Sequence, residues 1–280
     1  MPYIPFLTYA LILANIYISW KGLTSNAFFE QYSYRVDQIL VNKEYVRLIS
    51  SAFLHISWSH LIFNMLTLYL FGEMLEQGIG SVQFGIVYLA GLMGGKLLSL
   101  FIHRQHADYG SVGASGAICG IIFASLALFP GMSVRFIGIP IDIAGWLYGL
   151  GYLIYTIYGI RSKTDNIGHE SHLGGALIGM MVGLAMHPAA LLDNYTTIAI
   201  ITFPVIIFMY IILTRPYVLF VENLYFTTHL HNATIDDRYN LAKTQKKKEI
   251  DRILDKINVK GMNSLSKEEK QILDDYSNSL

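Results

Sequence analysis

The chain has 280 residues, of which 53% are hydrophobic and only 14% are charged. This composition is too apolar for an ordinary soluble domain and is typical of a protein with several membrane-spanning helices. The formal net charge is zero, so the sequence gives no reason to expect a nucleic-acid partner. The single cysteine, Cys119, excludes a disulfide within the chain.

Seven hydrophobic stretches are candidates for membrane spans, which need about 20 mostly apolar residues each. No Lys or Arg precedes the first stretch and no suitable cleavage site follows it, so we interpret it as a retained helix, not a signal peptide. The predicted spans are Pro5–Trp20, His60–Leu75, Val82–Ile102, Val112–Phe129, Ile141–Ile160, His172–His187 and Tyr195–Leu213.

The spans divide the chain into three predicted parts. Residues 1–192 form a six-span core, residues 193–214 an additional transmembrane helix, and residues 215–280 a soluble polar tail. The long loop Gly22–Ser59 mixes aromatic and charged residues, which is typical of a segment that lies partly in the membrane interface. In the tail, apolar residues at helical spacing and a capping-box pattern predict two short helices.

A stretch of small residues, Gly110–Gly120, opens the fourth predicted span. Its Ser115 stands where a helix begins, and the first four N–H groups of a helix have no partner within it. A serine there can present its hydroxyl beside free backbone donors, which is half of an acyl-transfer site. Small residues are also common at contacts between membrane helices, so packing alone would account for Ser115 taken by itself.

Two other spans place a base and further hydrogen-bond donors at a similar membrane depth. His172 begins the sixth span, and His60 and Asn64 begin the second, where a spacing of four puts both side chains on one helix face. Each could be an interfacial residue or a polar link between helices. Ionisable groups within spans are costly and usually mark function, so the three spans together favour catalysis.

Two glycine stripes predict how these groups meet. Gly116 and Gly120 form a small-xxx-small pair in the fourth span, as do Gly175 and Gly179 in the sixth. Such pairs let helix backbones approach closely. His172 shares a face with the second pair, so contact between the two stripes would bring the serine and the histidine together.

Other chemistries fit the sequence less well. The segment His169-Glu170-Ser171-His172 is one residue short of the His-Glu-x-x-His zinc signature, which disfavours a metal site. No two spans supply the central pair of aspartates that intramembrane aspartyl chemistry needs, and no inverted repeat indicates a transporter. We therefore expect neither a metal nor a cofactor.

Three motifs on successive even-numbered spans resemble the rhomboid family of intramembrane serine proteases. The resemblance extends from about Arg47 to His187. It implies an all-α membrane protein with a rhomboid-like six-helix bundle, followed here by a seventh, C-terminal transmembrane helix and a small soluble helical tail. The motifs are His60-x-x-x-Asn64, Gly113-Ala-Ser115-Gly116 and His172-Leu-Gly-Gly175 with the following Gly179.

The resemblance implies a serine endopeptidase that cleaves transmembrane helices of membrane-protein substrates within the lipid bilayer, through an acyl-enzyme. Ser115 would be the nucleophile and His172 the general base and acid, without an acidic third member. His60 and Asn64, with the Ser115 N–H, would bind the oxyanion. The alternative is a catalytically inactive rhomboid-like protein that binds membrane clients. Supporting roles are implied for Gly113, Gly116, Gly175, Gly179, Arg47, His55 and Glu76.

Two positions depart from the family pattern. Val46 precedes Arg47 where many members have tryptophan. Cys119 stands where bacterial members often place an aromatic residue that stacks on the catalytic histidine. We therefore expect another group to orient His172.

Charge bias and the resemblance disagree on membrane orientation. If all seven spans cross, the side that holds the odd-numbered loops and the tail carries nearly all Lys and Arg, which would place it in the cytoplasm. Bacterial rhomboids place that side outside. The first loop is long and the charge rule applies best to short loops, so we follow the resemblance. It predicts a multi-pass protein of a bacterial cytoplasmic (inner) membrane, with the active site open to the extracytoplasmic side.

Overall fold

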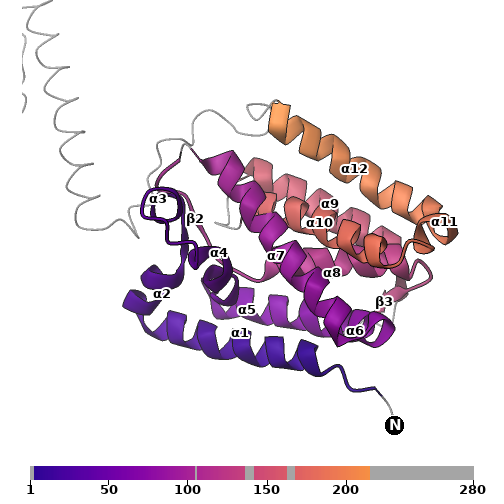
Figure 1. Cartoon of the computed structure of the whole chain (residues 1–280), viewed down its shortest axis with the longest axis horizontal. Coiled ribbons are helices and arrows are strands. Elements are labelled where there is room, and N and C mark those ends of the chain that lie inside the picture. Colours follow the sequence, from indigo (N-terminus) through magenta and orange to yellow (C-terminus); the bar gives the residue numbers. More distant parts are fainter. Residues whose placement is uncertain (1–2, 105, 136–141, 163–167, 215–280) are drawn as a thin grey trace, which may run out of the picture. The chain divides into compact units, whose positions relative to one another are not determined.

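The computed structural model describes residues 3–104, 106–135, 142–162 and 168–214. The chain forms two units, Met1–Val221 and Glu222–Leu280, and the second lies outside the described residues. The two helices predicted for the tail therefore also lie outside them. The described part of the first unit is helical apart from two short strand pairs (Figure 1).

Each predicted span coincides over most of its length with a helix or a continuous helical run, although the fifth begins in the short strand β4 and not in α9. This agreement confirms the all-α membrane fold. Among the described residues, α1, α7 and α12 are long and apolar enough to cross a membrane by their own length and composition. The second span is a run of two helices, α5 and α6, joined by the π-helical turn η2. The bounds are α1 Phe6–Thr24, α5 Trp58–Thr67, η2 Leu68–Gly72, α6 Glu73–Ile79, α7 Ser81–His103, α8 Ser115–Leu128, α9 Gly145–Ser162, α10 His169–Met186 and α12 Tyr195–Thr214.

The first loop folds into short elements that contact the segment entering α8. Strand β1 (Tyr34–Arg35) pairs antiparallel with β2 (Gly110–Ser111), so the loop lies at the same end of the bundle as the start of α8. The other short elements are α2 Asn26–Tyr32, α3 Val36–Leu40, α4 Arg47–Ser50, the 3-10 turn η1 Ser51–Phe53, the antiparallel pair β3 Ser133–Arg135 and β4 Asp142–Ala144, and α11 Ala190–Asp193.

Helix α8 lies at the centre of the bundle, with α7 and α10 packed on it. Twelve of its 14 residues are buried. A helix of this length extends only about 21 Å, against a hydrocarbon core of about 30 Å. Its first residue, Ser115, can therefore lie below the membrane surface while the other end reaches the opposite interface.

The three central helices touch through glycine backbones, as the two stripes predict. A Cβ on Gly91 of α7 would lie 3.1 Å from the Cα of Gly120, and one on Gly120 would lie 3.1 Å from the carbonyl oxygen of Gly175. A Cβ on Gly175 itself would overlap the carbonyl oxygen of Gly116. The close approach of α8 and α10 thus depends on residues without side chains.

Replacing Gly175 with alanine is expected to destabilise the bundle by about 3 kcal/mol, the upper end of overpacking effects, because the methyl group would meet a backbone carbonyl that cannot rotate away. Gly183→Ala is the matched control, since its Cβ would lie 3.2 Å from the Cβ of Ala124, a side-chain atom. Denaturant unfolding of the purified protein in detergent measures both variants. Equal losses of stability would contradict backbone contact at Gly175.

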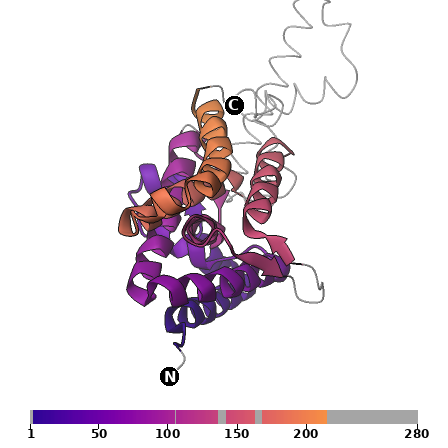
Figure 2. The same cartoon turned by 90° about the vertical axis from the view of Figure 1, so that its right-hand side faces the viewer.

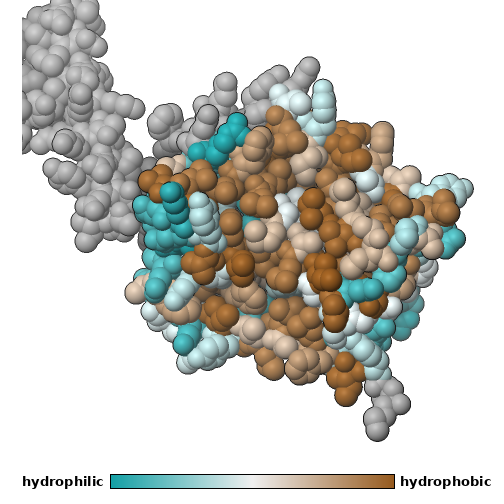
Figure 3. Space-filling model, in the orientation of Figure 1, coloured by the Kyte–Doolittle hydropathy of each residue, from teal (hydrophilic) through white to brown (hydrophobic). Residues whose placement is uncertain are grey.

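The outside of the described bundle is apolar, as lipid contact requires. Figure 3 shows hydrophobic side chains over the middle of the face formed by α1, α7 and α12, with hydrophilic residues gathered toward the left and right edges. Exposed large side chains on these helices include Phe6, Leu89 and Phe203. Figure 2 shows α12 and α1 on opposite sides of the bundle and α9 at its periphery. An exposed apolar surface of this extent fits contact with the lipid of a bilayer.

Candidate active site

A tight turn places Ser115 at the start of α8. Gly113 has a φ of +124°, in the region that favours glycine, and its N–H donates to the carbonyl of Ser51 at 3.0 Å. A Cβ on Gly113 would lie 3.0 Å from the Cε1 of His60 and 3.8 Å from the Oγ of Ser115. Glycine is therefore required at this position both for its backbone angle and for the space that the imidazole occupies.

The meeting of α8 and α10 brings Ser115 and His172 into contact. The Oγ of Ser115 lies 2.8 Å from the Nε2 of His172, a hydrogen-bond distance. The histidine is 3% exposed. Among the described residues, nothing forms a hydrogen bond with its Nδ1, so no carboxylate occupies the third position of a triad.

The two groups expected to bind an oxyanion both lie on α5, and His60 is the one that the structure places beside the turn before Ser115. The N–H of His60 donates to the Oγ of Ser57, which caps this helix, and the imidazole borders the turn at Gly113. Asn64 is buried one helical turn farther along. The structure thus brings Ser115, His172 and His60 together from three helices, with Asn64 one turn beyond.

An aromatic ring packs against His172, and it comes from α9, not from position 119. The ring centroid of Tyr152 lies 5.9 Å from that of His172, at an interplanar angle of 42°. The Sγ of Cys119 donates to the tyrosine hydroxyl at 3.3 Å. Sequence reasoning missed Tyr152. The spacing of Tyr152 from the other tyrosines of this span places these rings on one face of the helix. The spacing does not show which other helix that face contacts.

The comparison with known proteins decides the family. The Rhomboid domain family matches residues 42–189, which is more than half of the chain. The chain belongs to the rhomboid family. A second match, to a family of unknown function designated DUF6576, covers residues 233–279 of the tail.

Several relatives with rhomboid names are similar over the same region. "Rhomboid protein 1, mitochondrial" of Saccharomyces cerevisiae is 30% identical over 186 residues, covering 63% of this chain and 52% of the relative. "RHOMBOID-like protein 12, mitochondrial" of Arabidopsis thaliana is 26% identical over 185 residues, covering 60% and 54%. "Rhomboid protease GluP" of Bacillus subtilis is 28% identical over 190 residues, covering 65% and 35%.

The chain spans about half the length of the two mitochondrial relatives. Mitochondrial and bacterial names both occur among these rhomboid relatives. The comparisons and the apolar helices therefore support an integral membrane protein, but they do not support the predicted assignment to a bacterial inner membrane.

In this rhomboid domain His55 packs behind His60. Its Nδ1 lies 2.7 Å from the Oγ of Ser19 in α1, and its ring meets that of His60 edge-on at 5.0 Å. Burial, and then the nearby His60 and Lys96, lower the pKa of His55 to about 3. His55 is therefore neutral at any ordinary pH, and it packs against His60.

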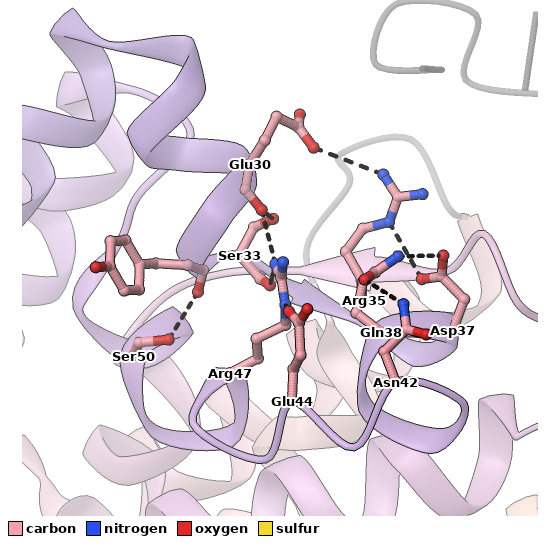
Figure 4. A network of polar contacts seen from close by, with 10 residues as sticks. Glu30, Ser33, Arg35, Asp37, Gln38, Asn42, Glu44, Arg47 and Ser50 are labelled. Atoms are coloured by element: carbon pink, nitrogen blue, oxygen red, sulfur yellow. Dashed lines mark hydrogen bonds and ion pairs between the residues drawn. The ribbon is translucent and has the colours of Figure 1, made fainter. Parts of the chain in front are cut away.

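Arg47 is structural in this rhomboid domain and holds the first loop together (Figure 4). Its guanidinium donates to the carbonyls of Glu30 at 2.7 Å and Ser33 at 2.8 Å, and to the carboxylate of Glu44 at 2.6 Å. These bonds join α2, the start of β1 and α4. Arg47 thus fixes the loop that pairs with the segment entering α8.

Glu76 lies at the other end of the rhomboid bundle from the active-site pair. Its carboxylate accepts from the N–H groups of Leu7 at 2.9 Å and Thr8 at 2.7 Å, and from the hydroxyl of Ser81 at 2.5 Å. First-turn N–H groups have no partner within a helix, so the carboxylate caps α1. Ser81 begins α7, whereas the start of α10, which carries His172, packs on the second half of α7, where a Cβ on Gly95 would meet the carbonyl of Ser171. The structure therefore separates Glu76 from the site.

Proposed function

We propose that this chain is an intramembrane serine endopeptidase with a catalytic dyad of Ser115 and His172. The observation that carries the proposal is the 2.8 Å contact between Ser115 Oγ and His172 Nε2, at the starts of two helices packed through glycine. A hydroxyl bonded to an imidazole is the arrangement that activates a serine nucleophile. The family match and the relative named a rhomboid protease agree with it.

In the proposed reaction His172 Nε2 takes the proton of Ser115 as Oγ bonds to the carbonyl carbon of the scissile peptide. The tetrahedral intermediate collapses, the carbon–nitrogen bond breaks, and the imidazolium returns the proton to the leaving amine. Water then attacks the acyl-enzyme with His172 again as base. No acidic third member takes part in this scheme.

The oxyanion is proposed to bind between α8 and α5. The N–H of Ser115 is among the first of α8, where the positive end of the helix dipole favours a developing negative charge. His60 and Asn64 supply side-chain donors from the neighbouring helix. Losing one such donor typically costs about 10² to 10³ in rate, so this group is a major part of the proposed catalysis.

Hydrolysis also needs water at the serine. A small crevice lined by Lys96, Gly113, Gly116 and Ser171, among others, lies beside the residues that flank the serine, and it does not admit a water molecule. We therefore expect water and substrate to enter when the surrounding helices separate.

The proposed substrates are transmembrane helices of other membrane proteins, because a serine held below the membrane surface would be reached by a chain that enters from the bilayer. Such a helix must expose a peptide bond, so cleavage is expected near helix-weakening residues at the end of a span. We further propose that the site opens on the membrane face that carries the first loop.

The test uses the full chain, purified in detergent and reconstituted in phospholipid vesicles. A fluorophosphonate probe is expected to label it covalently, and a reporter protein with one transmembrane helix is expected to be cut within or near that helix. A client-binding protein without catalysis would retain the reporter uncut and remain unlabelled. That result would overturn the proposal.

A further inference from the structure

A buried carboxylate near the dyad has no part in the proposed reaction. Glu170 is 5% exposed, in the first turn of α10. It accepts hydrogen bonds from Ser99 Oγ at 3.1 Å and His103 Nε2 at 2.9 Å, both on α7, and from the hydroxyl of Tyr109. Because hydrogen bonds to a carboxylate are roughly twice as strong as neutral ones, three donors hold this group firmly.

The donors are themselves held in place. The ring of His103 stacks on that of Tyr109, with centroids 3.6 Å apart and planes within 5°. Burial and the nearby Glu170 raise the pKa of Tyr109 well above its ordinary value, so its hydroxyl stays protonated and can donate. The N–H of Val36 in the first loop donates to the carbonyl of Tyr109 at 3.2 Å, which fixes the backbone of this segment.

The carboxylate joins the two parts of the chain that carry the dyad. Glu170 precedes His172 by two residues, and Tyr109 precedes Ser115 by six. Residues two apart on a helix do not face each other, so the mechanical link from Glu170 to His172 runs through the backbone of the first turn of α10.

We propose that Glu170 is a positioning residue, which sets the distance between Ser115 and His172 by clamping the start of α10 to the end of α7 and to the segment entering α8. This inference rests on the proposed function. Glycine contacts fix the middle of α10 against α8, but Glu170 fixes the turn from which the catalytic imidazole projects. A shift of about 1 Å in such a group can cost about 10² in rate.

Three variants of the full chain in vesicles test the clamp. Glu170→Gln keeps the shape and loses the charge, and should lower kcat about tenfold. Glu170→Ala removes all three bonds and should lower kcat about 100-fold, while KM stays within about twofold because no substrate contact is lost. Tyr109→Phe keeps the ring stacked on His103 and removes one bond, so its loss should be smaller than that of Glu170→Ala.

Gln83→Ala is the matched control, because Gln83 Oε1 and His187 Nε2 are 2.6 Å apart and link α7 and α10 at the opposite end of the same pair. It should lower the melting temperature and leave kcat per active site unchanged. Fluorophosphonate titration to completion counts the active sites in each preparation. The kcat is then calculated per active site, so unfolded protein does not lower it. Glu170→Ala can fail to fold, in which case Glu170→Gln and Tyr109→Phe carry the test.

A wild-type kcat in Glu170→Gln and Tyr109→Phe would overturn the clamp while leaving the dyad intact. A change confined to KM, or a fall in kcat of the same size in Gln83→Ala, would also overturn the clamp. Failure of the wild-type chain to label or to cleave would instead overturn the proposed function, and the two failures are thereby distinguished.

Discussion

Replacing Ser115 with alanine is expected to abolish cleavage of a transmembrane reporter, with a fall in kcat of at least about 10⁴-fold. In the proposed reaction the hydroxyl oxygen is the atom that forms the acyl bond, and it lies 2.8 Å from the imidazole nitrogen that would take its proton. Covalent labelling by a fluorophosphonate is expected to disappear as well. Reporter cleavage and labelling, measured on the same vesicle preparation, give the two readings.

Ser125→Ala is the control for this substitution. Ser125 lies on the same helix, is fully buried, and its hydroxyl donates to the carbonyl of Ile121 at 2.8 Å. The control therefore removes a buried hydroxyl from α8 at a position away from the dyad. It should cleave and label like the wild-type chain. Cleavage by the Ser115 variant at a rate near that of Ser125→Ala would show that another nucleophile does the chemistry.

The sequence predicted the helices and their central contact because both depend on local rules. A run of apolar residues of sufficient length has to form a helix in lipid, where every backbone group needs a partner within the segment. Small residues at a spacing of four mark the face where two such helices can touch. Gly116 and Gly175 followed these rules, and the serine and histidine beside them were therefore brought into contact.

The surroundings of the dyad depend on long-range contacts that no local pattern encodes. Tyr152 lies 20 positions before His172 on a helix with several tyrosines, and only the packing of α9 selects which one faces the imidazole. In the sequence Glu170 stands out only as part of an incomplete zinc signature. Helix α10 begins at His169, three residues before the predicted span, and this brings the carboxylate into the bundle.

Replacing His172 with alanine is expected to lower kcat by at least about 10⁴-fold while the protein remains folded. The serine hydroxyl would keep its place at the start of α8 but lose the base that removes its proton and the acid that protonates the leaving amine. His187→Ala is the matched control, since it removes a histidine at the far end of α10 that contacts Gln83. It should lower stability and leave cleavage per active site unchanged.

The double variant Ser115→Ala with His172→Ala adds the decisive comparison. Residues that act as one unit are strongly non-additive, so the double variant should be no slower than either single variant. Independent contributions would instead multiply, and the double variant would then lose about the product of the two factors. A multiplicative loss, or substantial cleavage and labelling by His172→Ala alone, would mean that the imidazole does not serve Ser115 as base, whatever the distance between them.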